Sequence, residues 1–114
     1  MATRQQEGDV FAALADPTRR RVLDLLAARG EGTATTLAGE LPVSRPAVIK
    51  HLAVLDRAGL VEGRRHGREV RYTVRTEPLG ETARWMSRLA SQWDGRLAAI
   101  KRLAEEDPNT QEIS

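Results

Sequence analysis

The chain has 114 residues, a formal net charge of +2 and a hydrophobic content of 40%. This length predicts a single domain, and no hydrophobic run approaches the roughly 18 residues of a membrane span, so no membrane partner is expected. The absence of cysteine excludes disulfides, thiol catalysis, iron–sulfur clusters and thiolate metal sites. The N-terminus lacks the apolar segment of a signal peptide, which predicts a cytoplasmic protein.

The charge is distributed unevenly along the chain. Residues 1–40 carry a net charge of −1, residues 41–75 carry +5, and residues 76–114 carry −2. A basic patch confined to one segment is typical of nucleic-acid binding, whereas scattered arginines would mean less.

Three short helices are predicted before this basic segment. The first spans residues 8–15, and the second begins after Asp16-Pro17, an N-cap followed by a proline at the first helical position, and ends near residue 28. Thr33 caps a third helix that extends to about residue 41. Residues 1–6 and 107–114 are expected to be flexible tails around a folded domain of residues 7–106.

A fourth helix begins after Ser44, a good N-cap, and stops before Gly59. Val48, Leu52 and Leu55 lie on its buried face at spacings of four and three. The opposite face carries a mixed, cationic set: Arg45, Ile49, Lys50, Ala53 and Arg57. With the third helix it forms a helix-turn-helix over residues 33–58, and a helix of this width fits the major groove of DNA.

Arg45 lies in the first turn of the fourth helix, where a cation is disfavoured by roughly 0.3–1 kcal/mol. A phosphate would reverse the sign of this effect, because it suits both the helix terminus and the arginine. An exposed arginine that contacts nothing explains the position equally well, so the helix alone does not decide between them.

A basic hairpin, the wing, is predicted over residues 60–74. Taking His66-Gly67 as a two-residue turn pairs Arg65 with Arg68, Arg64 with Glu69, Glu62 with Arg71, and Val61 with Tyr72. Val61, Val70 and Tyr72 then face the core with Gly63 between them. The like-charged Arg65–Arg68 pair is unfavourable for folding unless a phosphate or a narrow minor groove lies between the two. A solvated basic turn is the alternative, but helix and hairpin together favour nucleic acid.

The last segment shows a heptad pattern with spacings of four and three: Leu79, Ala83, Met86, Ala90, Trp93, Leu97, Ile100 and Ala104. A helix over residues 78–106 would be roughly 43 Å long, too long for one small domain to cover. The pattern therefore predicts a partner helix in a two-fold homodimer, with packing on the chain's own core as the alternative. Trp85 and Trp93 fill this core or interface, or line a ligand pocket.

In these combined motifs the chain resembles the ArsR family of bacterial winged helix-turn-helix repressors. The residues that carry the resemblance are 13–23, 37–41, 43–52, Leu55, 58–61 and the Gly67-Arg68…Tyr72 wing. The resemblance implies a mainly α fold with a small β-hairpin, dimeric through its first and last helices. The implied interface comprises Val10, Phe11, Leu14, Leu79, Ala83, Met86, Ala90, Trp93, Leu97 and Ile100.

The resemblance also implies which residues contact double-stranded DNA. The fourth helix would contribute Ser44, Arg45, Pro46, Ile49, Lys50 and His51, and the wing Arg64, Arg65, His66 and Arg68. Ser44 and Lys50 are equally plausible as phosphate contacts, which position the protein rather than specify sequence. We expect Arg19, Arg20 and Arg21 to be structural instead, pairing with acids on neighbouring helices.

Many family members sense metals through cysteines on the third helix or through Asp and His on the last helix. Here Thr33 occupies the cysteine position, and no His or Cys follows His66, which places the chain in a branch without metal-binding motifs. No metal or cofactor is therefore expected, although oxygen-only sites from Asp94, Glu105 or Asp107 remain conceivable. The inducer stays unknown.

The predicted function is a homodimeric repressor that binds a palindromic operator, associates with the nucleoid when bound to DNA, and is released by a signal that is neither thiolate-based nor a metal. The alternative is a protein-interaction or antitoxin-like module that uses the winged fold without specific DNA binding. An enzyme is disfavoured, because neither His51 nor His66 has a nucleophile or carboxylate partner at a catalytic spacing.

Overall fold

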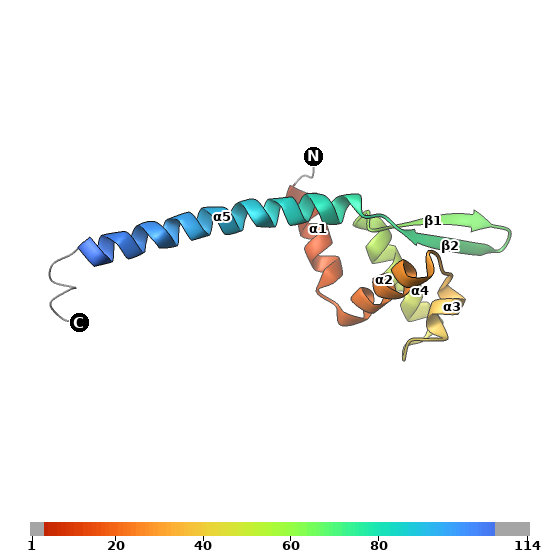
Figure 1. Cartoon of the computed structure of the whole chain (residues 1–114). Helices are drawn as coiled ribbons and strands as arrows, with labels where there is room; N and C mark the ends of the chain where they lie inside the picture. The colour runs from red at the N-terminus through yellow and green to blue at the C-terminus, as the bar shows by residue number, and fades with distance from the viewer. Residues whose placement is uncertain (1–3, 107–114) are drawn as a thin grey trace. The chain divides into compact units, whose positions relative to one another are not determined.

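A computed structural model describes residues 4–106. Its elements are α1 (Arg4–Leu14), α2 (Pro17–Arg29), α3 (Ala34–Ala38), α4 (Arg45–Arg57), β1 (Val61–His66), β2 (Glu69–Val74) and α5 (Glu77–Glu106), as Figure 1 shows. The chain divides into two compact units, the first ending at Thr82 and the second formed by the rest of α5. The predicted mainly α fold with one hairpin is confirmed.

Two of the predicted helix boundaries need correction. Helix α1 begins at Arg4, so residues 4–6 belong to a helix and not to the predicted tail, whereas residues 1–3 and 107–114 lie outside the described residues. Helix α3 ends at Ala38, before the predicted end at Leu41. Leu41 is nevertheless buried, because the turn after α3 places it in the core.

The helix starts follow from short-range capping, as predicted. Oδ1 of Asp16 accepts hydrogen bonds from the backbone N–H of Thr18 at 2.7 Å and of Arg19 at 3.2 Å. Oγ of Ser44 accepts one from the N–H of Ala47 at 3.3 Å. These bonds satisfy backbone donors that have no partner inside the helix, and they fix where α2 and α4 begin.

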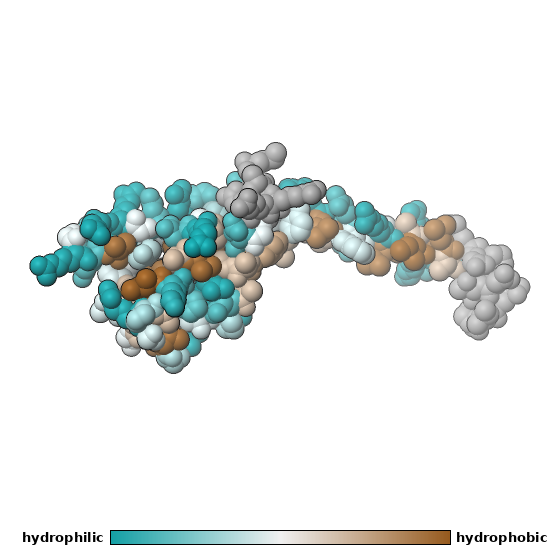
Figure 2. Space-filling view, turned by 180° about the vertical axis from the view of Figure 1, so that it is seen from behind, coloured by the Kyte–Doolittle hydropathy of each residue, from teal (hydrophilic) through white to brown (hydrophobic). Residues whose placement is uncertain are grey.

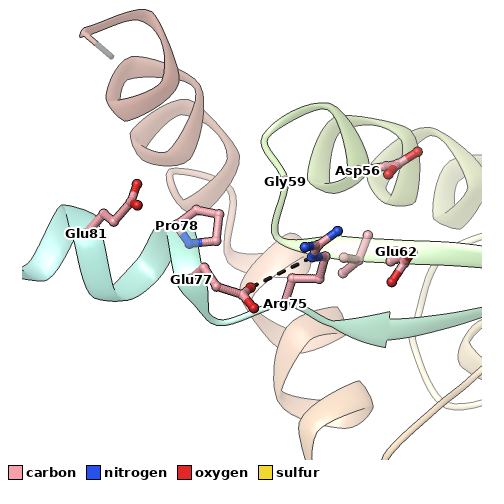
Figure 3. Close-up of a pocket in the computed structure, with 8 residues that line it drawn as sticks. Asp56, Gly59, Glu62, Arg75, Glu77, Pro78 and Glu81 are labelled. Atoms are coloured by element: carbon pink, nitrogen blue, oxygen red, sulfur yellow. Dashed lines mark ion pairs between the residues drawn. The ribbon is translucent and has the colours of Figure 1, made fainter. Parts of the chain in front are cut away.

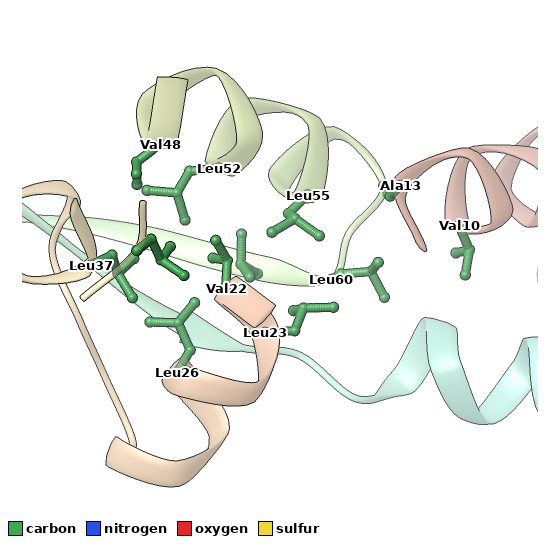
Figure 4. Close-up of a cluster of buried hydrophobic side chains, with 13 residues drawn as sticks. Val10, Ala13, Val22, Leu23, Leu26, Leu37, Val48, Leu52, Leu55 and Leu60 are labelled. Carbon is green, nitrogen blue, oxygen red and sulfur yellow. The ribbon is translucent and has the colours of Figure 1, made fainter. Parts of the chain in front are cut away.

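The core of the first unit lies beneath α4. Val48, Leu52 and Leu55 have no exposed surface, and they pack with the buried leucines and valines of α2, α3 and β1 shown in Figure 4. Each fully buried leucine contributes about 1.5–3 kcal/mol relative to an exposed one. Because this face of α4 is held in the core, its opposite face points to solvent.

The predicted register of the hairpin is wrong by two residues. The turn is Gly67-Arg68 rather than His66-Gly67, and β1 pairs with β2 as Val61–Val74, Glu62–Thr73, Gly63–Tyr72, Arg64–Arg71, Arg65–Val70 and His66–Glu69. Gly67 has a φ of 64°, and a turn with positive φ at its first central residue takes glycine there. The predicted turn would instead have put His66 at that position, where a side chain is unfavourable.

The faces of the hairpin are unchanged, because a shift of two residues keeps each side chain on its own side of the sheet. Val61 is buried, and Val70 and Tyr72 are half-buried on the same side. Gly63 lies directly opposite Tyr72, and a Cβ added there would be 2.8 Å from Cε1 of the tyrosine ring. Glycine is therefore required for the ring to pack over β1.

The other edge of β2 is also hydrogen-bonded, which the sequence did not predict. Gly32, in the connection between α2 and α3, donates its N–H to the carbonyl of Tyr72 at 3.1 Å and accepts the N–H of Tyr72 at 2.8 Å. This bridge ties the wing to the helix-turn-helix.

Helix α5 has 30 residues, which corresponds to a length of about 45 Å. Its large apolar side chains are unusually exposed: Met86 51%, Trp93 52%, Leu97 58%, Ile100 62% and Leu103 68%. Figure 2 shows hydrophobic surface gathered toward the C-terminal end of this helix. No helix among residues 4–106 combines the length and the hydropathy that crossing a membrane requires.

Three residues of the predicted dimer interface serve the chain's own core. Val10 has no exposed surface, so it cannot contribute contact area to a partner, and the interface prediction is corrected for it. Leu14 and Leu79 are half-buried against the same core. Phe11 is 39% exposed.

Candidate nucleic-acid interface

The exposed face of α4 carries the side chains that the sequence predicted for DNA contact. Arg45, Pro46, Ile49 and Lys50 are all exposed, and Ile49 shows 43% of its surface. Ile49 therefore leaves part of its apolar surface in solvent beside cationic side chains. Such a mixed face suits the base edges and phosphates of a major groove.

Arg45 lies in a depression of about 290 Å³ between α3, α4 and the wing. Its Nε donates a hydrogen bond to Oγ1 of Thr35 at 3.1 Å. Ile49 lines the same depression, as do Arg68 and Tyr72 of the wing. The fold thus brings two of the predicted helix residues, Arg45 and Ile49, and one of the predicted wing residues, Arg68, to one hollow. Thr35 was not predicted as a site residue, because no local sequence pattern signals a partner on another helix.

The wing separates its cations into two groups. On the outer face, Arg64 lies 3.7 Å from Glu62, and Arg71 lies 3.7 Å from Glu69 and 3.9 Å from Glu31. These carboxylates offset the like-charged Arg64–Arg71 pair and leave little net charge on that face.

Arg65 and Arg68, in contrast, take part in none of the ion pairs found between residues 4 and 106. The predicted Arg65–Arg68 pairing is wrong, but the two cations still lie at the tip without an acidic partner. His66 lies on the outer face of the sheet, opposite Glu69. The unbalanced positive charge of the wing therefore resides in Arg65 and Arg68.

His51 faces a different environment from the rest of the predicted set. It is half-buried, and its Nδ1 lies 3.4 Å from Nη1 of Arg19. Because the arginine can only donate, Nδ1 accepts in this contact. One ring nitrogen of His51 is thus engaged inside the protein, on the flank of α4 away from Arg45.

The first two arginines of α2 hold the C-terminus of α1. Arg19 donates from Nε to the carbonyl of Ala13 at 2.7 Å and from Nη2 to that of Ala12 at 3.1 Å. Arg20 donates to the carbonyl of Leu14 at 2.6 Å. Cations are favourable at a helix C-terminus, where carbonyls lack partners. The structural role expected for Arg19 and Arg20 is correct, but their main partners are carbonyls and not acids.

Asp16 completes this junction. Desolvation raises the pKa of its carboxyl group. The hydrogen bonds from the backbone N–H groups of Arg19 and Thr18 and the positive charge of Arg19 lower the pKa, and together they outweigh desolvation. The net result is a pKa below the usual value for aspartate. The charged form is therefore the one that stabilises the start of α2.

A second pocket, of about 500 Å³, is lined mainly by acidic side chains, in contrast to the basic face of α4 (Figure 3). Four carboxylates line it, those of Asp56, Glu62, Glu77 and Glu81, together with Arg75. Arg75 is itself 3.7 Å from Glu77. The carboxylates of this pocket would repel phosphates.

Within the part of the chain that the structure describes, no three His, Asp or Glu side chains converge to hold a metal ion. Asp94 and Glu105, two of the three conceivable oxygen ligands, are exposed on α5, and Asp107 lies outside the described residues.

Known proteins are similar to this chain in sequence and in fold. A family model described as a helix-turn-helix domain matches residues 14–64. The transcriptional repressor SdpR of Bacillus subtilis is 35% identical over 89 residues, covering 78% of this chain and 98% of the relative. The HTH-type transcriptional regulator Rv2034 of Mycobacterium tuberculosis is 42% identical over 83 residues, covering 73% of this chain and 75% of the relative.

Among solved structures, an ArsR-like transcriptional regulator from Rhodococcus sp. RHA1 superimposes with a TM-score of 0.79 at 47% identity, covering 90% of this chain and 96% of the other. Sequence, fold and the basic face of α4 thus agree with one another. The chain belongs to the ArsR family of winged helix-turn-helix proteins and is a DNA-binding transcriptional regulator.

Proposed function

We propose that this protein is a homodimeric repressor that binds a two-fold symmetric operator. Helix α4 enters the major groove with Arg45, Pro46, Ile49 and Lys50, and the wing tip follows the backbone with Arg65 and Arg68. The observation that carries the proposal is the shared hollow in which Arg45 and Arg68, neither of them in an ion pair among the described residues, lie with exposed Ile49. His51 and Arg64 have internal partners and contribute less.

The dimer is supported by the exposed apolar side chains of α5. Five large apolar residues of this helix are at least half exposed, which a monomeric protein rarely tolerates on one element. Pairing two such helices about a two-fold axis would remove this surface from water. It would also supply two copies of α4, each reading one half of a palindrome.

Release from DNA is proposed to follow a signal other than a metal or a thiol reaction. The chain has no cysteine, and its two histidines, His51 and His66, both lie in the elements proposed to contact DNA. Repression of a target gene would end when this signal favours a state with lower affinity for the operator.

Alanine substitution of Arg45 and of Lys50 tests the assignment of α4. We expect both variants to lose specific binding to a DNA fragment that the wild type selects, measured by fluorescence anisotropy, while their oligomeric state is unchanged. Arg84→Ala, on α5, is the matched control because it removes the same charge outside the α4–wing face. Full operator affinity in both α4 variants would refute the assignment.

Ionic strength gives a second readout of the same proposal. Each phosphate contact releases a counterion, so the logarithm of affinity should fall with the logarithm of salt concentration by about 0.9 per contact. A flat response would argue for the alternative, a winged-helix interaction module without specific DNA binding. Failure to select any sequence from genomic fragments would argue for it as well.

A further inference from the structure

Thr35 and Arg45 belong to different helices of the helix-turn-helix and meet on its exposed surface. The contact joins Nε of Arg45 to Oγ1 of Thr35 at 3.1 Å. Thr35 lies in the first turn of α3, but the capping box of that helix is formed by Thr33 and Thr36. The hydroxyl of Thr35 is therefore not used to start α3.

We propose that Thr35 is a positioning residue that presents Arg45 to a guanine in the major groove and so sets the base preference at one position of each half-site. This inference rests on the proposed function, because it requires α4 to enter the groove. It adds a residue from α3 to the machinery that determines specificity.

The geometry of the guanidinium group decides how Arg45 can bind. The group has five N–H donors, one on Nε and four on the two terminal nitrogens. With Nε held by Thr35, the fork that combines Nε with a terminal nitrogen is occupied. The remaining fork, formed by Nη1 and Nη2, can donate two parallel hydrogen bonds to O6 and N7 of guanine.

The contact also reduces the cost of ordering Arg45. An exposed arginine populates many rotamers, and DNA binding must select one of them. A hydrogen bond already made in the free protein restricts these rotamers before binding. Since one such bond is modest, we expect its removal to lower discrimination by about three- to tenfold, comparable with the ordering cost of one flexible side chain.

The surroundings of Arg45 are compatible with this role. Arg68 and Ile49 line the same depression as Thr35 and Arg45, so a base edge entering it meets two cationic groups and an apolar contact. Glu69 also lines this depression, but its carboxylate lies 3.7 Å from Arg71 and is offset by that charge. The major-groove edge of guanine offers only acceptors, which matches an arginine fork.

Three threonine variants separate positioning from folding. Thr35→Val keeps the shape of the side chain and removes the acceptor, whereas Thr35→Ser keeps the hydroxyl. Thr36→Val is the matched control, because it removes a hydroxyl in the same turn that caps α3 and does not contact Arg45. All three are compared with the wild type and with Arg45→Ala on a selected operator and on each of its single-base-pair substitutions.

We expect the wild type to prefer guanine at one position per half-site and Arg45→Ala to lose that preference. Thr35→Val should lose about three- to tenfold of the discrimination at that position only, and Thr35→Ser should restore it. Thr36→Val should lower the melting temperature and leave base preference unchanged.

The proposal is overturned if Thr35→Val keeps the full preference, or if it weakens binding equally on every sequence, which would indicate a phosphate contact for Arg45. If Arg45→Ala loses the base preference and Thr35→Val keeps it, Thr35 has no positioning role, although the proposed reading of DNA by Arg45 stands. A wild type that selects no sequence would overturn the proposed function, and this inference with it.

Discussion

Leucines in the two units of this protein differ in solvent exposure. Leu52 and Leu55 on α4 have no exposed surface, whereas Leu97 and Leu103 on α5 are 58% and 68% exposed. Leu52, Leu55 and Leu97 each belong to an apolar pattern with spacings of three and four, which is typical of a buried stripe. The winged-helix unit buries these apolar residues within the chain, whereas those of α5 stay exposed, which supports the proposed contact with a second copy. The wing shows a similar division for charge. Glutamates offset the arginines on its outer face, whereas Arg65 and Arg68 at its tip have no acidic partner among the described ion pairs.

The largest effect is expected in the core. Leu52→Ala should lower the free energy of unfolding by about 2–5 kcal/mol, because it leaves a cavity where the neighbours cannot collapse. Urea denaturation followed by circular dichroism measures this loss. Leu97→Ala in the same assay, under conditions where the protein is monomeric, should change stability little. Equal losses in the two variants would contradict the comparison.

A charge placed in the apolar stripe of α5 should break the proposed dimer. Leu97→Asp would bury an unpaired carboxylate between helices, which costs several kcal/mol, so self-association should weaken by at least about tenfold. Sedimentation equilibrium measures the dissociation constant. Ser91→Asp, with the same charge on the opposite side of α5, is the control and should leave the dimer intact. A Leu97→Asp variant that still dimerises would show that this stripe is not the interface.

Neutralising single arginines of the wing should separate its tip from its outer face. Arg65→Ala and Arg68→Ala should each reduce the salt dependence of DNA binding by about one phosphate contact. Arg64→Ala should reduce it less, because Glu62 already offsets that charge. Anisotropy titrations at several salt concentrations measure the slopes. The same slope in all three variants would mean that the ion pairs of the outer face do not matter for binding.

The smallest effect concerns the junction of α1 and α2. Because the pKa of Asp16 is lowered in the folded protein, its contribution to stability is present above the unfolded value, about 3.9, and is lost as the pH falls through the lowered folded value. Asp16→Asn retains a capping oxygen but does not titrate. The melting temperature should therefore fall less between pH 7 and acid pH in Asp16→Asn than in the wild type. Identical losses would show that ionised Asp16 does not stabilise the folded protein.

Features of this fold that depend on neighbours in sequence could be predicted from the sequence. Asp16, Thr33 and Ser44 each cap the helix that follows, and Gly59 takes the positive φ of 77° that ends α4. The hairpin was predicted with the correct faces but the wrong register. Both His66-Gly67 and Gly67-Arg68 are plausible two-residue turns, and the choice depends on which position the glycine fills.

Contacts between distant segments gave no local signal. Thr35 meets Arg45, Arg19 reaches both the carbonyls of α1 and His51, and Gly32 bridges to Tyr72. Each of these contacts depends on how whole helices pack. The predicted DNA contacts were chosen by face and charge alone, so they could not distinguish Arg45 in a shared hollow from His51, whose ring already has an internal partner.

Selection of bound duplexes from a random library by the purified full-length protein tests the central claim most directly, because it depends on both regions at once. We predict an enriched motif with two-fold symmetry whose half-sites are centred about 10–10.5 base pairs, one helical turn, apart. The symmetry would report pairing through α5, and the sequence preference would report reading by α4. Enrichment of an asymmetric motif would contradict the dimer, and the absence of any enriched motif would contradict sequence-specific reading by α4.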